Sequence, residues 1–270
     1  MGQGVNVSRA IVFGAIACAL FSLIVPGPAL TQTSLRVAAA ADLEPVLPPI
    51  LEQFTQATGI KAEATFKSSA VLTTQIENGA PFDLFFSADM GFPKRLIDAG
   101  LADAAGTVDS TTPILYARGT LVLWTRKDAR LPAPSLDLLR SPELKRLAIA
   151  NPDRAPYGRA AVAALTTLKL YDALKPKLVT AENIAQAAQY VDSGNADAGL
   201  ISLTSAMTPH MTEGGSYFVI PRDLYPPIEQ GAVIVSKTAQ RAAAHKLLDY
   251  LLSAPVQAQL AKSGLMPAHQ

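Results

Sequence analysis

The sequence predicts an α/β protein of two lobes, each with a mostly parallel sheet covered by helices, and a cleft between the lobes. Short apolar segments typical of buried strands alternate with segments of helical spacing along most of the chain, which is the pattern of parallel strands joined by helices. After an N-terminal leader-like segment, about 240 residues remain, enough for one large or two modest domains. No long flexible linker separates the two halves.

The first residues have the layout of a secretory signal. Arg9 is the only charge before residue 36, an apolar run follows at 10–25, and small residues end the break at 26–29. The run is short for a membrane span, so we expect residues 1–29 to be a cleavable signal peptide and the protein to be periplasmic. The only cysteine, Cys18, lies in this segment, so the mature chain would fold without disulfides.

Charge and surface pattern exclude some partners. Removing the signal segment with its single arginine lowers the formal net charge from +1 to zero. No basic stripe or polybasic tail is present, so we expect no nucleic-acid partner. The helix faces alternate between core and solvent without an extended apolar patch, so we expect no structural or adaptor role. We also expect a monomer.

The first half of the chain contains three strand–helix units. Residues 35–40 form a short apolar strand, and residues 44–58 have helical spacing and end at Gly59, a common helix terminator. Ser68 and Ser69 begin the next helix, because hydroxyl residues are favoured at that position. The further elements expected here are strands 60–66 and 83–87 and helix 92–99.

The second half repeats the alternation. We expect strands 121–125, 147–150, 198–203 and 232–235, and helices 160–174, 181–193, 240–252 and 255–263. With these elements the first lobe would comprise residues 34–115 and 232–270, and the second lobe residues 116–231.

The inventory of reactive groups is mostly negative. His210, His245 and His269 are scattered, and none has metal-ligand spacing with another ligating residue. The sequence has no nucleophile elbow, phosphate-binding loop or glycine-rich dinucleotide turn. We therefore expect neither a bare-cation site, nor a cofactor, nor a catalytic centre.

The sequence does contain several helix starts that carry small or hydroxyl residues, and these are suited to an anion. The first N–H groups of a helix have no acceptor within it, and in open α/β sheets they lie in the crevice beyond the strand ends. Residues 151–158 are the most suitable segment. There Pro156 fixes the approach, Tyr157 offers its backbone N–H, and Gly158 keeps a side chain out of the cleft.

Four segments carry a family resemblance, namely residues 35–43, 66–69, 78–89 and 150–158. They resemble the periplasmic molybdate-binding proteins of ABC importers, the ModA family, and the match continues in order to the C-terminus. The resemblance implies a type II periplasmic binding fold. In that fold two lobes close on a tetrahedral oxyanion, here molybdate and also tungstate, and deliver it to an inner-membrane ABC permease.

The resemblance also implies which residues bind the anion. In the first lobe the family positions fall on Asp42, with Ala41 beside it, and on Ser69, with Ser68 beside it.

In the second lobe the turn donor falls on Tyr157 and the donor at the next helix start on Ile184. Ser202 stands where some members have a tyrosine.

Asp42 departs from what a dianion requires, because molybdate only accepts hydrogen bonds and a site for it should present donors. A carboxylate about 4 Å from one like charge costs on the order of 4 kcal/mol at an effective dielectric near 20. Two interpretations remain open. Asp42 caps its own helix and turns away, or it accepts a hydrogen bond from a protonated anion such as hydrogen phosphate or arsenate.

An exported enzyme is the remaining alternative. Asp42, Asp89 and Tyr157 could serve as acid–base groups around the cleft. Without an activated nucleophile or a paired base, we expect no enzymatic activity.

Overall fold

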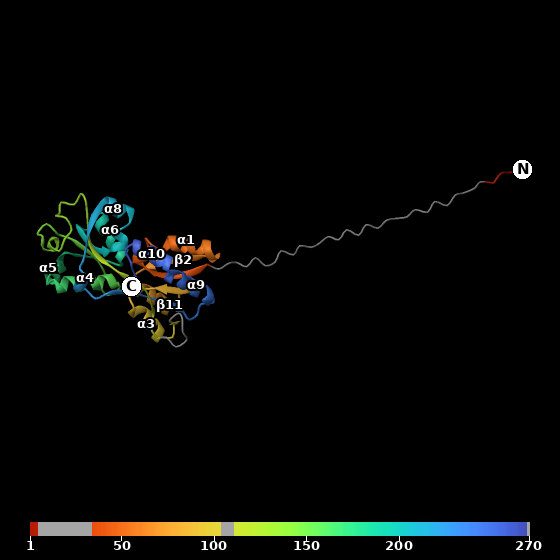
Figure 1. Cartoon of the computed structure of the whole chain (residues 1–270), viewed down its shortest axis with the longest axis horizontal. Helices are drawn as coiled ribbons and strands as arrows, with labels where there is room; N and C mark the ends of the chain where they lie inside the picture. The colour runs from red at the N-terminus through yellow and green to blue at the C-terminus, as the bar shows by residue number, and fades with distance from the viewer. Residues whose placement is uncertain (5–33, 104–110, 269–270) are drawn as a thin grey trace. The chain divides into compact units, whose positions relative to one another are not determined.

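A computed structural model describes residues 1–4, 34–103 and 111–268 (Figure 1). The chain divides into two units, Met1–Thr31 and Gln32–Gln270, and every element below belongs to the second unit. The expected signal peptide lies almost wholly in residues outside the described ranges and stays a prediction, as does any role of His269. No helix in the described ranges is long and apolar enough to cross a membrane.

The first sheet has seven strands: β1 (Leu35–Ala40), β2 (Ala62–Lys67), β3 (Leu84–Phe86), β4 (Ala102–Asp103), β5 (Ile114–Gly119), β11 (Ile228–Val235) and β12 (Met266–Pro267). The order is β12-β5-β11-β3-β1-β2, and β4 pairs with β11. Strand β1 is parallel to both β2 and β3, so the carboxyl ends of these three strands meet at one edge.

The second sheet has five strands: β6 (Leu121–Arg126), β7 (Leu147–Ala150), β8 (Leu178–Ala181), β9 (Ala198–Ser202) and β10 (Gly215–Val219). The order is β10-β6-β9-β7-β8, and β7 is parallel to both of its neighbours.

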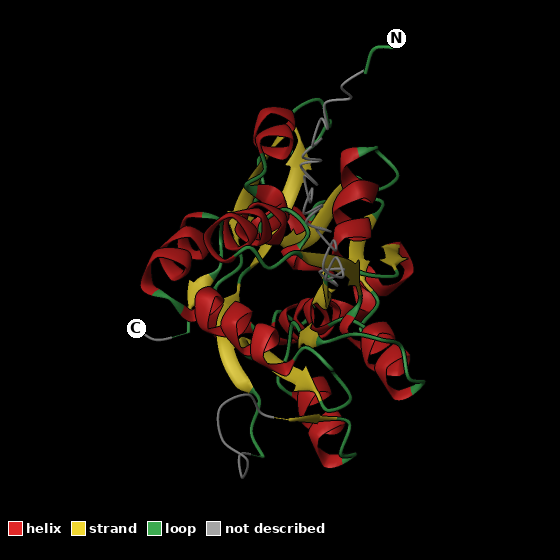
Figure 2. Cartoon of the chain, turned by 90° about the vertical axis from the view of Figure 1, so that its right-hand side faces the viewer, coloured by secondary structure: helices red, strands yellow, loops and turns green. Residues whose placement is uncertain are grey.

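Helices flank the strands of both sheets (Figure 2). The α-helices are α1 (Leu47–Thr58), α2 (Ser69–Glu77), α3 (Gly91–Asp98), α4 (Pro156–Thr167), α5 (Tyr171–Leu174), α6 (Ile184–Asp192), α7 (Leu203–Ala206), α8 (Pro209–Gly214), α9 (Arg241–Leu252) and α10 (Ala254–Lys262). Short 3₁₀ helices are η1 (Ala41–Leu43), η2 (Asp137–Arg140), η3 (Lys175–Lys177) and η4 (Arg222–Leu224). The face of α1 that carries Ile50 and Phe54 is buried, as its spacing predicts, and the Phe54 ring lies 5.5 Å from that of Tyr250 on α9.

Each sheet is the centre of one lobe, and the chain passes between the lobes twice. The first passage lies between β5 and β6, at Thr120, and the second between β10 and β11, in residues 220–227. Strands β5 and β11 belong to the first sheet over their whole lengths. Judged by which sheet each strand joins, the two passages lie a few residues from the lobe boundaries expected at 115/116 and 231/232. The first lies later in the chain and the second earlier.

The strand directions and one helix differ from the sequence-based expectation for a clear physical reason. The sheets are mixed rather than mostly parallel, because β5, β6 and β11, which lead into or out of the passages, pair antiparallel with neighbours. The helix expected at 160–174 is two helices, α4 and α5. Lys169, with φ of 58°, separates them in the left-handed conformation, which ends a helix.

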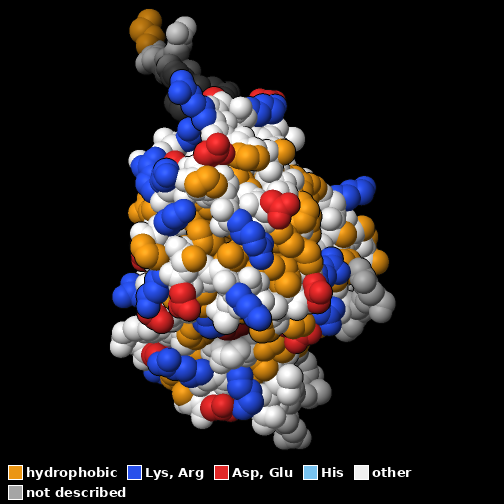
Figure 3. All heavy atoms as spheres, turned by 90° about the vertical axis from the view of Figure 1, so that its left-hand side faces the viewer, with side chains coloured by type: hydrophobic (Ala, Val, Ile, Leu, Met, Phe, Trp, Pro, Cys, Tyr) orange, Lys and Arg blue, Asp and Glu red, His pale blue; other side chains and the backbone are white. Residues whose placement is uncertain are grey.

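The surface carries charges of both signs. Figure 3 shows a face on which Lys and Arg side chains are interspersed with Asp and Glu side chains and apolar ones. This distribution differs from the single-sign stripe of a nucleic-acid interface.

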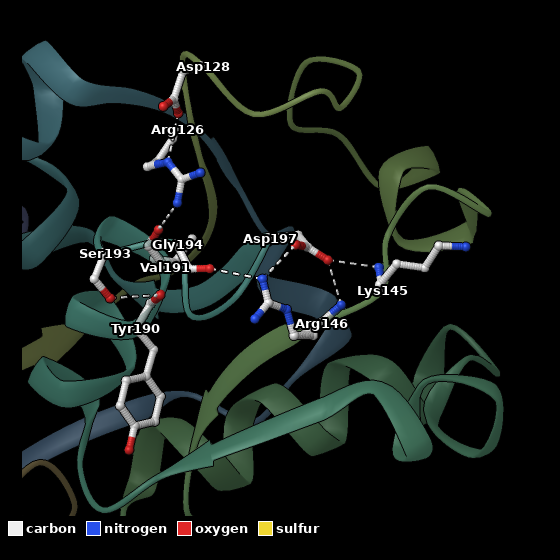
Figure 4. A network of polar contacts seen from close by, with 9 residues as sticks. All are labelled: Arg126, Asp128, Lys145, Arg146, Tyr190, Val191, Ser193, Gly194 and Asp197. Atoms are coloured by element: carbon white, nitrogen blue, oxygen red, sulfur yellow. Dashed lines mark hydrogen bonds and ion pairs between the residues drawn. The ribbon is translucent and has the colours of Figure 1, made fainter.

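A polar network closes the end of α6 in the second lobe (Figure 4). The Asp197 carboxylate accepts the backbone N–H groups of Lys145 (2.9 Å) and Arg146 (2.7 Å). The Arg146 guanidinium donates to the carbonyl oxygen of Gly194 at 2.9 Å. The Arg126 guanidinium donates to the carbonyl oxygen of Val191 at 3.4 Å. The two guanidinium groups give donors to carbonyl oxygens at the C-terminus of α6, and Asp197 gives an acceptor to the backbone just before β7.

Gly194→Ala is expected to lower the free energy of unfolding by about 1–2 kcal/mol. Gly194 has φ of 80°, and an added Cβ would lie 3.2 Å from the Arg126 guanidinium carbon. Urea unfolding measures the change. Equal midpoints for the variant and the wild type would contradict it.

Candidate functional site

A small cavity lies between the two lobes, beyond the carboxyl ends of the parallel strands. Residues of both lobes line it: Ala40, Ala41, Asp42, Ser68, Ser69 and Ala88 from the first, and Ala155, Pro156, Tyr157, Asn183 and Ile184 from the second. Six of the seven site residues expected from the sequence are in this lining. Ser202 is absent from it, and its hydroxyl instead caps α7 by accepting the Ser205 N–H at 3.2 Å.

Three helices begin at this cavity. Ser69 starts α2, Pro156 starts α4 and Ile184 starts α6, and each lines the cavity. The unpaired N–H groups of a first turn and the positive end of the helix dipole both favour an anion. Asn183 caps α6, accepting the N–H of Gln186 at 2.9 Å, which fixes the first turn in place.

Two serine hydroxyls add donors from the first lobe. The Ser69 hydroxyl oxygen accepts the Ala88 N–H at 3.1 Å, so its own proton can be donated to a ligand. Within the described residues the buried Ser68 hydroxyl has no hydrogen-bond partner. A buried hydroxyl that lines a cavity without a protein partner is suited to a ligand oxygen.

The turn before α4 is built by its own backbone. The Ala155 N–H donates to the Asn151 carbonyl oxygen at 2.8 Å, and the Asn151 N–H donates to that of Ala181 at 2.7 Å. A Cβ on Gly158 would lie 2.8 Å from the carbonyl carbon of Asn151 and would overlap the carbonyl oxygen of Ala150. The expectation that Gly158 keeps a side chain out of the cleft was therefore wrong. A side chain at Gly158 would collide with the backbone of the preceding turn, and glycine avoids that collision.

Asp42 does not cap a helix, so the capping expected for it was wrong, whereas its orientation toward a ligand stays a prediction. No side chain caps η1 or α1. Asp42 is 0% exposed, and its Oδ2 accepts hydrogen bonds from Gln230 Nε2 at 2.5 Å and from the Tyr157 hydroxyl at 3.2 Å. Burial raises the pKa of Asp42 to about 6, although the two hydrogen bonds lower it. Burial, followed by the nearby Asp42 charge, holds the pKa of Tyr157 well above 10, so Tyr157 is a neutral donor.

Gln230 is the residue that the sequence-based search missed. It is fully buried in β11, at a β-bulge between Gln230 and Gly231. Gln230 follows Glu229 at the polar start of the strand, so no local signal marked it; its burial does, because a buried polar side chain needs a partner.

Further contacts join the lobes around the cavity. The Thr204 hydroxyl donates to the Asp42 carbonyl oxygen at 2.8 Å, and the Ala70 N–H donates to that of Arg154 at 3.2 Å. Arg159 pairs with Asp89, a residue considered for acid–base chemistry, which lies outside the cavity lining. These contacts show that the two lobes are closed on each other.

The chemistry of the lining is that of a neutral donor set. Asp42 is the one acidic residue in the lining, and no lysine or arginine lines the cavity. In the described part of the chain, no group of three or more His, Cys, Asp and Glu residues could hold a metal ion. His210 lies on the surface, 2.9 Å from a carboxylate oxygen of Asp192. The cavity can therefore bind an anion through hydrogen bonds and helix dipoles rather than through a counter-ion.

Comparisons with known proteins find relatives over most of the chain. The profile of a family described as bacterial extracellular solute-binding protein matches residues 35–266. The molybdate-binding protein ModA of Azotobacter vinelandii is 41% identical over 216 residues, or 80% of this chain and 83% of that protein. ModA of Rhodobacter capsulatus is 39% identical over 198 residues, or 73% of this chain and 74% of that protein. The solved structure of the A. vinelandii periplasmic molybdate-binding protein matches with a TM-score of 0.80 and 32% identity, over 86% of this chain and 99% of that one.

Proposed function

This chain belongs to the bacterial extracellular solute-binding proteins and, within them, to the ModA family, and from that premise we propose that it captures molybdate for an ABC importer. Its fold is the type II periplasmic binding fold expected from the sequence. Tungstate, which has the same shape and charge as molybdate, is the second ligand of the proposal. The protein acts in the periplasm as a monomer, without a cofactor, and delivers the anion to an inner-membrane permease.

The convergence of three helix N-termini and two serines on one cavity between the lobes carries the proposal. Molybdate accepts hydrogen bonds and has none to donate. Lobe closure removes water, which strengthens each N–H and O–H bond to the anion. The lining offers no activated nucleophile, so binding occurs without catalysis.

Hydrogen phosphate and arsenate remain the second candidates, through one observation. Asp42 Oδ1 is buried and has no partner among the described residues, so it could accept a ligand proton. Against them, Gln230 and Tyr157 already occupy Oδ2.

Titration calorimetry of the purified protein against molybdate, tungstate, sulfate and phosphate tests the proposal. We expect molybdate and tungstate to bind far more tightly than sulfate, and phosphate to give no heat. Phosphate binding as strong as that of molybdate would reverse the assignment. Native mass spectrometry identifies any anion that stays bound during purification.

Ser69→Ala is expected to weaken molybdate binding about 10- to 100-fold, because a hydrogen bond to a charged ligand contributes about 1.5–3 kcal/mol. Ser216→Ala is the matched control, since that serine is exposed on β10. Urea unfolding of both variants separates lost affinity from lost stability. Unchanged affinity in Ser69→Ala would remove this serine from the site.

A further inference from the structure

A carboxyl and a carboxamide face each other beside the anion cavity. Asp42 and Gln230 are both 0% exposed, and Gln230 Nε2 donates to Asp42 Oδ2 at 2.5 Å. The other oxygen of each group, Asp42 Oδ1 and Gln230 Oε1, is buried and lacks a hydrogen-bond partner among the described residues. Two acceptors are thus left without a donor on two groups that are already joined.

One proton gives both oxygens a partner. A neutral carboxylic acid at Asp42 can donate from Oδ1 to Gln230 Oε1 while Oδ2 continues to accept from Nε2, which is the paired arrangement of an acid with an amide. Flipping the Gln230 amide does not remove the need for a proton. It would place Gln230 Oε1 next to Asp42 Oδ2, and these two acceptors would again have no donor between them. An ionised carboxylate, by contrast, would be buried without any cation in contact.

We propose that Asp42 is a neutral acid when the lobes are closed on the anion, so that the protein takes up one proton from solvent for each dianion it captures. The inference rests on the proposed function and extends it. It makes Asp42 a residue that sets specificity, because the neutral acid removes the repulsion that a carboxylate would exert on molybdate.

Lobe closure is what drives the protonation. Gln230 lies in the first lobe with Asp42, whereas the Tyr157 hydroxyl and Thr204 come from the second lobe and cover Asp42. When the lobes part, water reaches the carboxyl and its pKa falls toward the ordinary value of 3.8, compared with about 6 when it is buried. The raised pKa therefore favours closure at low pH, and this contribution is lost as pH rises through 6. A bound dianion raises the pKa of Asp42 further, so that in the complex this contribution to closure is lost only at higher pH.

The surrounding groups do not oppose this titration. The ionisable groups nearest to Asp42 are tyrosines: Tyr157 on α4 and Tyr116 on β5, with Tyr225 beside Tyr157. Burial raises the pKa of each, so all three are neutral between pH 5 and 8. Asp89, whose charge acts on Tyr116, is paired with Arg159, and the Glu44 carboxylate, two residues from Asp42, is exposed to solvent.

Molybdate titrations of the wild type and Asp42→Asn, at several values between about pH 5 and 8, test the proposal. Asparagine has the shape of the neutral acid and can donate to Gln230 Oε1. The wild-type dissociation constant is expected to rise with pH, approaching about tenfold per unit, while the Asp42→Asn constant stays level. Above pH 7 the variant is expected to bind more tightly than the wild type. Calorimetric binding heats measured in buffers of different ionisation enthalpy give the number of protons taken up on binding. We expect one proton for the wild type and none for Asp42→Asn.

Glu44→Gln is the matched control, because it removes a nearby carboxylate that is exposed. It is expected to keep the pH dependence of the wild type. Infrared difference spectra on molybdate addition provide a second readout, a protonated-carboxyl band that Asp42→Asn lacks. Molybdate binding that is tight but shows no proton uptake and no such band would overturn this inference and leave the proposed function standing. Failure of both proteins to bind molybdate at any pH would overturn the proposed function as well.

Discussion

Gly158→Ala is expected to unfold the turn that begins α4 and to lower the free energy of unfolding by about 3 kcal/mol, as overpacking against a rigid backbone does. The added methyl group would overlap the Ala150 carbonyl oxygen and lie 2.8 Å from Pro152 N. These are backbone atoms of β7 and its turn, so no rotamer change can relieve the overlap. The first turn of α4 must move away from the cavity, and molybdate affinity is expected to fall with stability.

Gly214→Ala is the matched control for this substitution. A Cβ there has nothing within 4 Å, and Gly214 ends α8 away from the cavity. Guanidinium unfolding of both variants, followed by molybdate titration, makes the comparison. A Gly158→Ala protein as stable and as tight-binding as Gly214→Ala would show that the turn tolerates a side chain.

Gly119→Ala is expected to weaken molybdate binding about 10- to 100-fold while leaving each lobe folded. Gly119 ends β5 in the first lobe, and its Cβ would overlap the hydroxyl of Tyr157, lie 2.8 Å from that ring and lie 3.2 Å from Gln230 Nε2. Tyr157 belongs to the second lobe. The added methyl group therefore disfavours the closed form. In the open form Tyr157 moves away with the second lobe, so the overlap is absent.

A double substitution separates this clash from a general loss of stability. Tyr157→Phe removes the overlapping oxygen, so Gly119→Ala should cost less affinity in that background than in the wild type. Small-angle scattering with molybdate should show Gly119→Ala shifted toward the open form. Equal affinity losses in the two backgrounds would rule out the Tyr157 hydroxyl as the obstacle.

Much of the fold was predictable because local patterns determine it. Strands β1 and β7 match the predicted ranges, and α1 ends at Gly59 as predicted. Strands β5, β8 and β10 were not predicted. Their pairing depends on neighbours distant in sequence, and tertiary packing determines such strands more than propensity does. The break at Lys169 lacks the glycine that usually signals a helix end.

The site divides in the same way. Tyr157 could be predicted from the proline that marks its helix start, and the resemblance to the ModA family indicated Ser69 and Ile184, which also stand at helix starts in the structure. The hydrogen-bond partners of Asp42 could not be predicted, because Tyr157 and Gln230 lie 115 and 188 positions away along the chain. Whether an aspartate caps its own helix or accepts from distant donors depends on how the lobes close, and no local pattern encodes that.

The two passages between the lobes imply an order of folding. The second lobe is one continuous segment, whereas the first cannot complete its sheet until β11 inserts between β5 and β3. Arg118 meets Glu229 across 111 positions, and contacts over such separations form slowly. The second lobe should therefore fold first. On the proposed export route, which threads the chain N-terminus first, the first lobe is expected to complete its sheet only after β11 has crossed, later than the second lobe.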